Sequence, residues 1–254
     1  MKITLVQMDI VWADHAQNAL AASRAIDDSP ASDIYVLPEM WSTGFVTRPQ
    51  GVAEPEEGQS LCWMKRKAAS TGAAIVGSIA VQTDRGEFRN RMYFVKPDGE
   101  VTCYDKRHLF SYGTETMHYS PGDERVVVEY KGVRFLLQVC YDLRFPVWSR
   151  NRGDYDAVIY VASWPVTRIE VWRTLLKARA IENQCYAIGV NRIGNDPTCS
   201  YPGATAFVDP YGRAQECPDG EPSVITGEID MDFLRSFRKK FPVLEDRDVN
   251  WNWK

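Results

Sequence analysis

Short runs of apolar residues alternate with longer segments in which apolar positions recur every three or four residues, and these two patterns predict strands and helices. The runs are rich in Val, Ile and Leu, and turn-forming residues bound many of them. We expect strands at residues 1–10, 34–37, 73–82, 91–96, 101–104, 125–130, 133–140, 157–162, 185–191, 204–208 and 224–229. Helices are expected at residues 16–26, 61–70, 169–183 and 232–240.

Turn and loop signals separate these elements without dividing the chain. A Pro-Asp-Gly triplet at 97–99 and a Lys-Gly pair at 131–132 each stand between two predicted strands, as is typical of tight turns. Residues 107–122 lose all periodicity, so we expect a loop there. Strands and helices alternate without an internal repeat or a change of composition. This pattern predicts one α/β domain over residues 1–254, with residues 241–254 as a C-terminal tail.

The composition excludes several classes of protein. The chain is 44% hydrophobic and 25% charged, which is ordinary for a soluble globular protein. Its net charge of −4 offers no basic surface for nucleic acid or anionic lipid, and no apolar run is long enough to span a membrane. The N-terminal residues enter a strand pattern without the apolar core of a signal peptide, so a cytoplasmic protein is expected.

The cysteines and histidines form neither a disulfide framework nor a metal-binding pattern. No C-x-x-C pair occurs, and a chain of this length does not need disulfides, so reduced thiols are expected. The histidines have no metal-ligand spacing with one another or with the cysteines, so no zinc site is expected. These residues are Cys62, Cys103, Cys140, Cys185, Cys199, Cys217, His15, His108 and His118.

One cysteine lies where a thiol is readily activated. Cys140 ends the strand expected at 133–140, and Pro146, a residue favoured in a first helical turn, follows shortly after it. Backbone N–H groups at such a strand-to-helix junction stabilise a thiolate and an anion that forms beside it. An isolated buried cysteine is more often a small core residue, so the functional interpretation depends on other parts of the chain.

Two charged residues also follow predicted strands. Glu39 comes after the strand at 34–37, where partial desolvation would suit it to acid–base catalysis, although a surface charge is the commoner role. Lys106 follows the strand at 101–104 and is either part of a solvated basic cluster or an ammonium that stabilises an oxyanion. A base, an oxyanion stabiliser and a nucleophile at strand ends are the groups needed for acyl transfer from an amide.

The sequence around these residues resembles a known family. The blocks LPEMWSTGF around Glu39, YDKRHLF around Lys106 and VCYDLRFPVWSR around Cys140 are similar to the signature blocks of the nitrilase, or carbon–nitrogen hydrolase, superfamily. The resemblance continues through residues 161–165, 178–194 and 203–212. Together with KFPVLEDRD near the C-terminus, it is strongest to the bacterial omega-amidase branch, which hydrolyses ω-amides of the 2-oxoglutaramate type.

This resemblance implies an α/β fold, a four-layer α-β-β-α sandwich, and a role for each matching residue. Glu39 matches the general base, Lys106 the catalytic lysine, and Cys140 the nucleophile. Glu115, which from its loop position alone would be solvated, matches a second glutamate that positions the lysine or the substrate. The backbone N–H of Tyr141 is expected to complete the oxyanion hole, and the implied mechanism needs no metal or organic cofactor.

The substrate pocket is less well determined by the sequence. A 2-oxo acid amide carries a carboxylate, for which an arginine is the expected partner. Arg144 is near the nucleophile, although a structural ion pair with Asp142 or Asp156 is an equal alternative. Aromatic residues are more often core than pocket. Three that adjoin the motif blocks are candidates for the pocket wall: Trp41, Phe45 and Trp164.

Other functions and an oligomeric state are also considered. Within the superfamily, the alternatives are a nitrilase proper, a carbamoylase acting on N-carbamoyl amines and a deaminated-glutathione amidase. Outside the superfamily, the alternatives are a catalytically silent scaffold and a papain-like enzyme that uses His108 or His118. The resemblance implies a homodimer, for which the apolar helix at 169–181 and three aromatic residues of the tail fit an interface: Phe241, Trp251 and Trp253.

Overall fold

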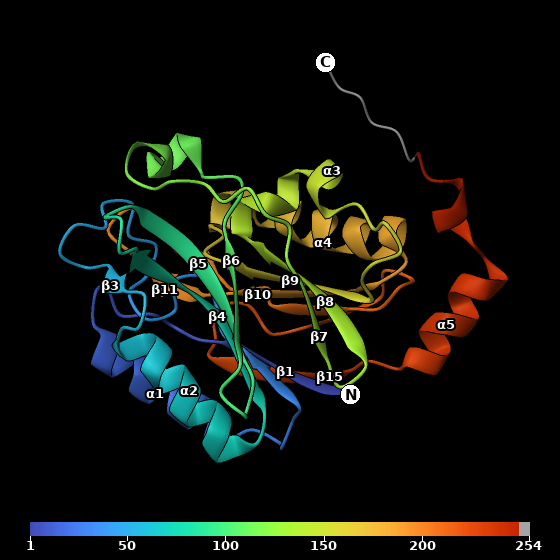
Figure 1. Cartoon of the computed structure of the whole chain (residues 1–254), viewed down its shortest axis with the longest axis horizontal. Helices are drawn as coiled ribbons and strands as arrows, with labels where there is room; N and C mark the ends of the chain where they lie inside the picture. The colour runs from blue at the N-terminus through green and yellow to red at the C-terminus, as the bar shows by residue number, and fades with distance from the viewer. Residues whose placement is uncertain (249–254) are drawn as a thin grey trace.

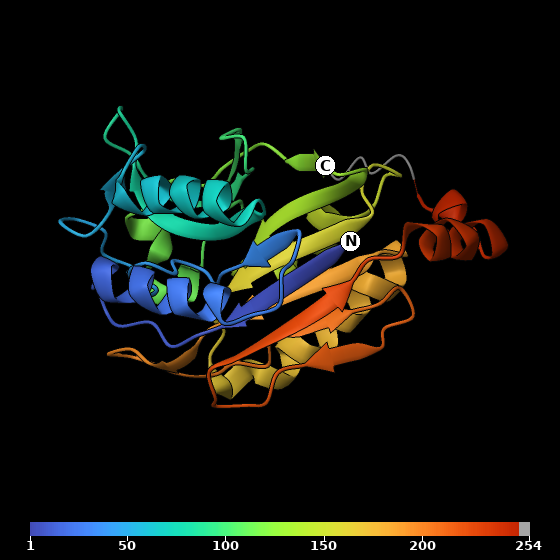
Figure 2. The same ribbon diagram turned by 90° about the horizontal axis from the view of Figure 1, so that it is seen from below.

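Two β-sheets stack face to face in the computed structural model, which describes residues 1–248, and helices cover both outer faces (Figure 1, Figure 2). The four-layer α-β-β-α sandwich expected from the sequence is therefore confirmed. Within the described residues, the first sheet runs in the order β15 (Ser223–Glu228), β1 (Lys2–Gln7), β2 (Ile34–Val36), β4 (Ala74–Gln82), β5 (Phe88–Val95) and β6 (Val101–Asp105), with the short β3 (Glu54–Pro55) beside β4.

The second sheet is parallel at its centre and antiparallel at both edges. Over the same part of the chain, its order is β14 (Ala214–Glu216), β13 (Ala206–Val208), β10 (Tyr186–Asn191), β9 (Ala157–Ala162), β8 (Val133–Val139) and β7 (Val127–Tyr130). A separate hairpin is formed by β11 (Ile193–Asn195) and β12 (Ser200–Pro202).

Helices lie on the outer faces of the two sheets. Helices α1 and α2 cover the first sheet, whereas α4 covers the second (Figure 2). No helix within residues 1–248 is long and apolar enough to cross a membrane. The α-helices are α1 (His15–Asp27), α2 (Gln59–Thr71), α3 (Pro146–Ser149), α4 (Ile169–Asn183) and α5 (Met231–Lys240). The 3₁₀ helices are η1 (Ser111–Gly113), η2 (Glu115–Met117), η3 (Cys140–Arg144), η4 (Val166–Arg168) and η5 (Val243–Asp246).

The main core lies between the sheets, and it explains why the strand runs are almost entirely apolar. Leu5 of β1, Phe94 of β5 and Leu137 of β8 are fully buried in one cluster. Strands covered on both faces have no solvent-facing side, so they read as continuous hydrophobic runs. Gly189 of β10 lets α4 approach closely, because a Cβ there would lie 2.4 Å from Cδ1 of Leu176.

The predicted elements agree with this structure except for short or irregular segments. The strands β3, β11, β12 and β14 were not predicted, because each spans only two or three residues with little apolar character. The helix expected to start at Pro146 is a single turn, and a 3₁₀ helix already begins at Cys140. The loop expected at 107–122 contains η1 and η2.

Helix α5 extends from one end of the sandwich (Figure 1). It is attached through buried Leu234 and through Arg238, whose Nη1 donates to Oδ1 of Asp156 at 2.8 Å. The tail expected from residue 241 begins with exposed Phe241 and contains η5. Two of the residues predicted for a subunit interface, Trp251 and Trp253, lie outside the described residues.

Candidate active site

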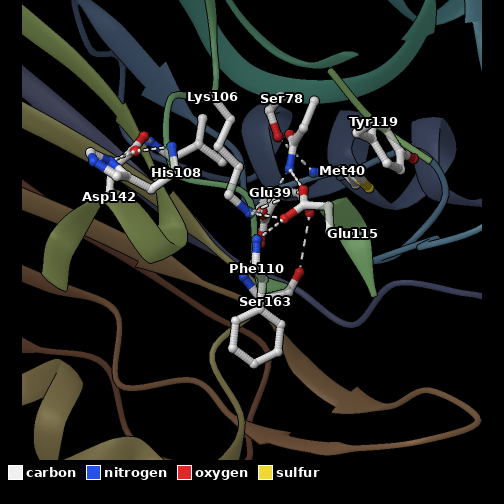
Figure 3. A network of polar contacts seen from close by, with 12 residues as sticks. Glu39, Met40, Ser78, Lys106, His108, Phe110, Glu115, Tyr119, Asp142 and Ser163 are labelled. Atoms are coloured by element: carbon white, nitrogen blue, oxygen red, sulfur yellow. Dashed lines mark hydrogen bonds and ion pairs between the residues drawn. The ribbon is translucent and has the colours of Figure 1, made fainter. Parts of the chain in front are cut away.

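Lys106 lies between two glutamates in a fully buried ionic network (Figure 3). Its Nζ donates to Oε1 of Glu39 at 2.9 Å and to Oε2 of Glu115 at 2.9 Å. All three side chains have no solvent-exposed surface. Because buried charges are stable only when they are paired and hydrogen-bonded, this network fixes the position of each group.

The three residues come together because their elements converge at one end of the sandwich. Glu39 follows β2, and Lys106 follows β6 in the same sheet. The loop after Lys106 turns back at η2 and brings Glu115 inward, where Oε2 accepts the Phe110 N–H at 2.6 Å. The solvated position expected for a loop glutamate is therefore wrong for Glu115, and the surface alternatives are wrong for Glu39 and Lys106.

Cys140 occupies a strained turn at the end of β8. Its φ angle of 45° lies in the left-handed region, which residues other than Gly rarely adopt. Asp142 holds this turn, because Oδ2 accepts the Val139 N–H at 3.0 Å and Oδ1 accepts the His108 N–H at 2.9 Å. His108 belongs to the segment that follows Lys106, so Asp142 connects the cysteine turn to the lysine.

The ionisation of these groups follows from burial and mutual charge. Burial raises the pKa of the Cys140 thiol well above its usual value, and the charge of Glu39 raises it further, whereas Lys106 opposes the shift. Burial would lower the pKa of Lys106, but the charges of Glu115 and Glu39 outweigh it and raise that pKa. Burial also raises the pKa of Glu115, against the effect of Lys106. The resting state therefore holds an ammonium and a neutral thiol, which needs a base before it can attack.

A cavity of about 680 Å³ opens beside Cys140. Three arginines line it, Arg48, Arg144 and Arg168, and no acidic side chain does so among the described residues. Aromatic rings from separate loops form much of the remaining wall: Trp12, Phe45, Phe110, Tyr112, Trp164 and Tyr201. Such a cavity favours a small anionic ligand with apolar carbon atoms.

Comparison with known proteins agrees with this geometry. The sequence pattern of the family described as "Carbon-nitrogen hydrolase" matches residues 2–239. The chain belongs to the carbon–nitrogen hydrolase family. It is 44% identical to "Omega-amidase YafV" of Escherichia coli K12, over 100% of this chain and 99% of that protein. It is 34% identical to "2-oxoglutaramate amidase" of Bacillus subtilis, over 96% of each.

The fold comparison gives the same family. The crystal structure of XC1258 from Xanthomonas campestris, described as a CN-hydrolase superfamily protein with an arsenic adduct in the active site, has a TM-score of 0.95 to this chain. The two are 39% identical, and the match covers 100% of this chain and 99% of that one.

In this carbon–nitrogen hydrolase, Phe45 and Trp164 line the cavity, but Trp41 does not. The prediction of Trp41 as a pocket residue is wrong, because its indole is fully buried against Trp63, with ring centroids 4.7 Å apart. Gly77 of β4 leaves the space that the indole fills, since a Cβ there would lie 2.8 Å from Cδ1 of Trp41. A large aromatic ring gains more from this complete burial than from a place in a solvated pocket.

Arg144 is not tied to either predicted aspartate. Its guanidinium lies over the Trp164 ring at 5.2 Å from the centroid, and it forms no ion pair with any of residues 1–248. Asp142 binds the cysteine turn as described above, and Asp156 pairs with Arg134 and Arg238. Of the two alternatives for Arg144, the structure therefore supports the cavity position.

Several groups at the site were not predicted from the sequence. Ser163 donates its backbone N–H to Oε2 of Glu39 at 2.9 Å, and Asn90 donates Nδ2 to Oε1 of the same carboxylate at 2.8 Å. Ser163 lies within the matching block at residues 161–165, but nothing in the sequence marks Asn90. Arg48 and Arg168 also escaped prediction because each lies just beyond the end of a matching block. Within residues 1–248, no group of three or more His, Cys, Asp or Glu is arranged to hold a metal ion.

Proposed function

We propose that this protein is an omega-amidase. It uses Cys140 to hydrolyse the terminal amide of small 2-oxo acid ω-amides, such as 2-oxoglutaramate and 2-oxosuccinamate, to the acid and ammonia. The main support is the fully buried Lys106, held between two carboxylates, since Lys106 and Glu39 both act on the thiol of the strained Cys140. The relatives named omega-amidase and 2-oxoglutaramate amidase, at 44% and 34% identity, support the substrate class.

The first half of the reaction forms a thioester. Glu39 accepts the thiol proton as Sγ of Cys140 attacks the amide carbon, which is necessary because burial raises the pKa of that thiol. The carbonyl oxygen becomes an oxyanion, which the Lys106 ammonium and the Tyr141 N–H stabilise. Tyr141 belongs to the first turn of η3, where backbone N–H groups have no partner within the helix.

The second half consumes the thioester. As the tetrahedral intermediate collapses, the C–N bond breaks and Glu39 returns the proton to the departing ammonia. Glu39 then removes a proton from water, the hydroxide adds to the thioester carbon, and the C–S bond breaks. Cys140 leaves as a thiol after taking back that proton, and the acid is released. Every proton passes through one carboxylate, and no oxidant or reductant takes part.

Glu115 acts on the lysine in this scheme rather than on the substrate. Its carboxylate accepts from Nζ of Lys106 at 2.9 and 3.2 Å, and it raises the pKa of that ammonium. The lysine therefore remains charged throughout the cycle. A permanently charged, immobile ammonium stabilises an oxyanion better than one that must first reorient.

The 2-oxo acid carboxylate pairs with Arg144 in this proposal. The guanidinium lines the same cavity as Cys140 and is free of any ion pair within residues 1–248. Phe45 and Trp164 contact the carbon chain of the substrate between these two ends. Arg48 and Arg168 keep the cavity cationic, which favours anions over the zwitterion glutamine.

Release of ammonia from a panel of amides tests this function. We expect kcat/KM for 2-oxoglutaramate and 2-oxosuccinamate to exceed that for glutamine by at least about tenfold, because the ammonium of glutamine is repelled by the arginines. The Cys140→Ala variant is the matched control and should release no ammonia. Faster turnover of a nitrile, an N-carbamoyl amine or deaminated glutathione would instead assign the protein to another branch of the family.

A catalytically silent scaffold predicts a different result. In that case none of these compounds is hydrolysed, although the fold is intact. Alkylation of Cys140 by iodoacetamide, followed by mass spectrometry, measures whether the thiol reacts independently of any substrate. A papain-like mechanism would need a histidine at the thiol, but neither His108 nor His118 is among the residues that line the cavity. The double variant His108→Ala, His118→Ala should therefore keep substantial activity.

We also propose a single-domain homodimer that acts in the cytoplasm with reduced cysteines. All six cysteines are free thiols. Ile181 at the end of α4 and Phe241 after α5 are more than half exposed, which suits an interface between subunits. Light scattering coupled to size-exclusion chromatography should give twice the chain mass of 28.9 kDa. A species of 28.9 kDa alone would exclude the dimer.

A further inference from the structure

Asn90, a residue of β5, contacts both carboxylates of the buried network. Its Nδ2 donates to Oε1 of Glu39 at 2.8 Å and to Oε1 of Glu115 at 3.1 Å. Nζ of Lys106 donates to the same two oxygens at 2.9 and 3.2 Å. One amide and one ammonium therefore bridge the same pair of carboxylate oxygens.

We propose that Asn90 is a positioning residue of the amidase, which holds the two carboxylates around Lys106 so that the Glu39 carboxylate stays in place beside the Cys140 thiol, with which it interacts. The inference rests on the proposed function and extends it to a residue outside the signature blocks. Oε1 of Glu39 is fixed by Asn90 and Lys106, and Oε2 accepts the Ser163 N–H. A carboxylate restrained at both oxygens has little freedom to rotate away from the thiol.

A neutral donor is the type of group that this network requires. Glu39 and Glu115 carry two negative charges against one positive charge on Lys106, and all three are fully buried. A second cation would bind the base too tightly, and another acid would repel both carboxylates. An amide N–H₂ supplies a hydrogen bond to each carboxylate without changing the net charge.

The oxygen of the Asn90 amide indicates that the residue is polar because of the hydrogen bonds that its N–H₂ group donates. Oδ1 of Asn90 is buried and has no partner within residues 1–248. An unpaired buried oxygen is unfavourable, so an apolar residue would suit this position better if packing alone decided it. The reversed amide would direct Oδ1 at two carboxylates, which excludes that orientation.

The backbone of Asn90 supports the same role. Its carbonyl accepts the Lys106 N–H at 3.0 Å, so one residue anchors the lysine segment and orients both carboxylates. It pairs with Ala80 in the register of β4 and β5 and is 1% exposed. A buried side chain on a strand that is paired on both sides is held more rigidly than one on a loop.

The Asn90→Leu variant tests the proposal, since leucine has the same branched shape and no donor. Without the two hydrogen bonds from Nδ2, the ionised form of the base loses a stabilising donor, and the base must be ionised to act. We expect the acid limb of the kcat–pH profile to move to higher pH by about one unit. At neutral pH, kcat should fall by about 10- to 100-fold, whereas KM should change by less than about threefold.

Other titratable groups near the Asn90 amide do not reverse the expected shift of the acid limb to higher pH. Lys106 remains an ammonium well above the pH range tested, and burial keeps the phenol of Tyr119 protonated by raising its pKa. Asn90 contacts Glu39, Glu115 and Lys106, and the charges of this network act in turn on Cys140 and Tyr119.

Two further variants separate positioning from stability. Asn90→Asp keeps the shape but adds a third carboxylate, so it should lower kcat more than Asn90→Leu does. Asn151→Leu is the matched control, because Nδ2 of this buried asparagine donates only to the backbone carbonyls of Tyr155 and Asn183, at 3.1 and 3.0 Å. It should lower Tm and leave the acid limb unchanged.

A readout without substrate distinguishes this inference from the proposed function. The pH dependence of Cys140 alkylation by iodoacetamide should show the same upward shift in Asn90→Leu and Asn90→Asp. If no amide is hydrolysed but this shift occurs, the substrate assignment fails and the role of Asn90 stands. Variants of Asn90 that lower Tm while their alkylation and kcat profiles superimpose on those of the unaltered protein would overturn it.

Discussion

At the scale of single residues, the site depends on the buried ammonium of Lys106, which is stable only because two carboxylates surround it. Lys106 has no contact with solvent, and its ammonium is compensated by Glu39 and Glu115. Removing one member of a buried ionic network leaves the others uncompensated, which costs more than the interaction itself contributes. The same network therefore carries both the proposed chemistry and a large share of local stability.

Replacing Lys106 by Met is expected to affect activity and stability together. Two buried carboxylates would face each other without a cation, so the free energy of unfolding should fall by roughly 3–5 kcal/mol. The kcat should drop by at least about 1,000-fold because the oxyanion loses its charged donor. Urea denaturation and ammonia release measure the two effects. Lys131→Met removes a half-exposed lysine paired with Asp33 and should cost less than about 1 kcal/mol.

The backbone at Cys140 gives a second prediction at this scale. Its φ angle of 45° strains any residue with a Cβ, and Gly adopts this region without strain. Cys140→Gly should therefore be more stable than Cys140→Ala by roughly 1 kcal/mol, although both are inactive. Thermal unfolding of the two variants compares them directly. Equal stability would show that the surrounding hydrogen bonds, and not the residue type, determine this turn.

At the scale of elements, the network follows from where strands end. Strands β2 and β6 lie in the first sheet and end near Glu39 and Lys106, and β8 lies in the second sheet and ends at Val139. The stacked sheets bring these ends to one side of the molecule. Away from the site, α5 is held in part by the buried carboxylate of Asp156, which pairs with Arg134 and with Arg238 of this helix.

Stability should depend on pH through Asp156. Burial would raise the pKa of this carboxyl, but Arg134 and Arg238 outweigh it and lower the pKa. The stabilisation is therefore present above the unfolded pKa of about 4 and is lost as the pH falls through the lower folded value. Asp156→Asn should destabilise the protein at pH 7, and the difference should decrease as the pH falls below about 4. Urea titrations of both proteins at several pH values measure it, and a constant difference would contradict the prediction.

At the scale of the whole molecule, the cavity is assembled from segments far apart in the sequence. Arg48 lies between β2 and β3, whereas Arg144 and Arg168 are the last residues of η3 and η4, and all three line one space of about 680 Å³. None of the described lining residues is acidic, so the potential inside is positive. In the proposed function, these charges together favour an anion, and Arg144, the last residue of the helix that begins at Cys140, orients it.

Arg144→Leu tests this division of roles. Loss of a bidentate partner for the 2-oxo acid carboxylate should lower kcat/KM for 2-oxoglutaramate by about 10- to 100-fold, mainly through KM. Hydrolysis of a neutral aliphatic amide should change by less than about threefold, because it has no carboxylate to bind. Steady-state kinetics with both substrates measure the effect. An equal loss for both would indicate that Arg144 supports the cysteine turn instead.

Features that depend on neighbouring residues could be predicted from the sequence. Continuous apolar runs identified the strands, and motif blocks marked Glu39, Lys106 and Cys140. Sequence analysis failed at Trp41 and did not find Asn90, because the environment of each is set by residues distant in the chain. For Trp41, Gly77 of a neighbouring strand provides the space; for Asn90, two separate segments supply the carboxylates.

The sequence by itself determined the fold class, the order of most elements and three of the groups at the site. These features depend on residues that are close together in the chain: the spacing of apolar side chains and the residue type at the end of each strand. Only the tertiary structure decided the burial of Glu115, the cationic cavity and the bridging position of Asn90. These depend on contacts between residues up to 124 positions apart in the site network, as with Ser163 and Glu39. Desolvation and charge pairing act through space, so folding must bring such groups together before their chemistry is defined.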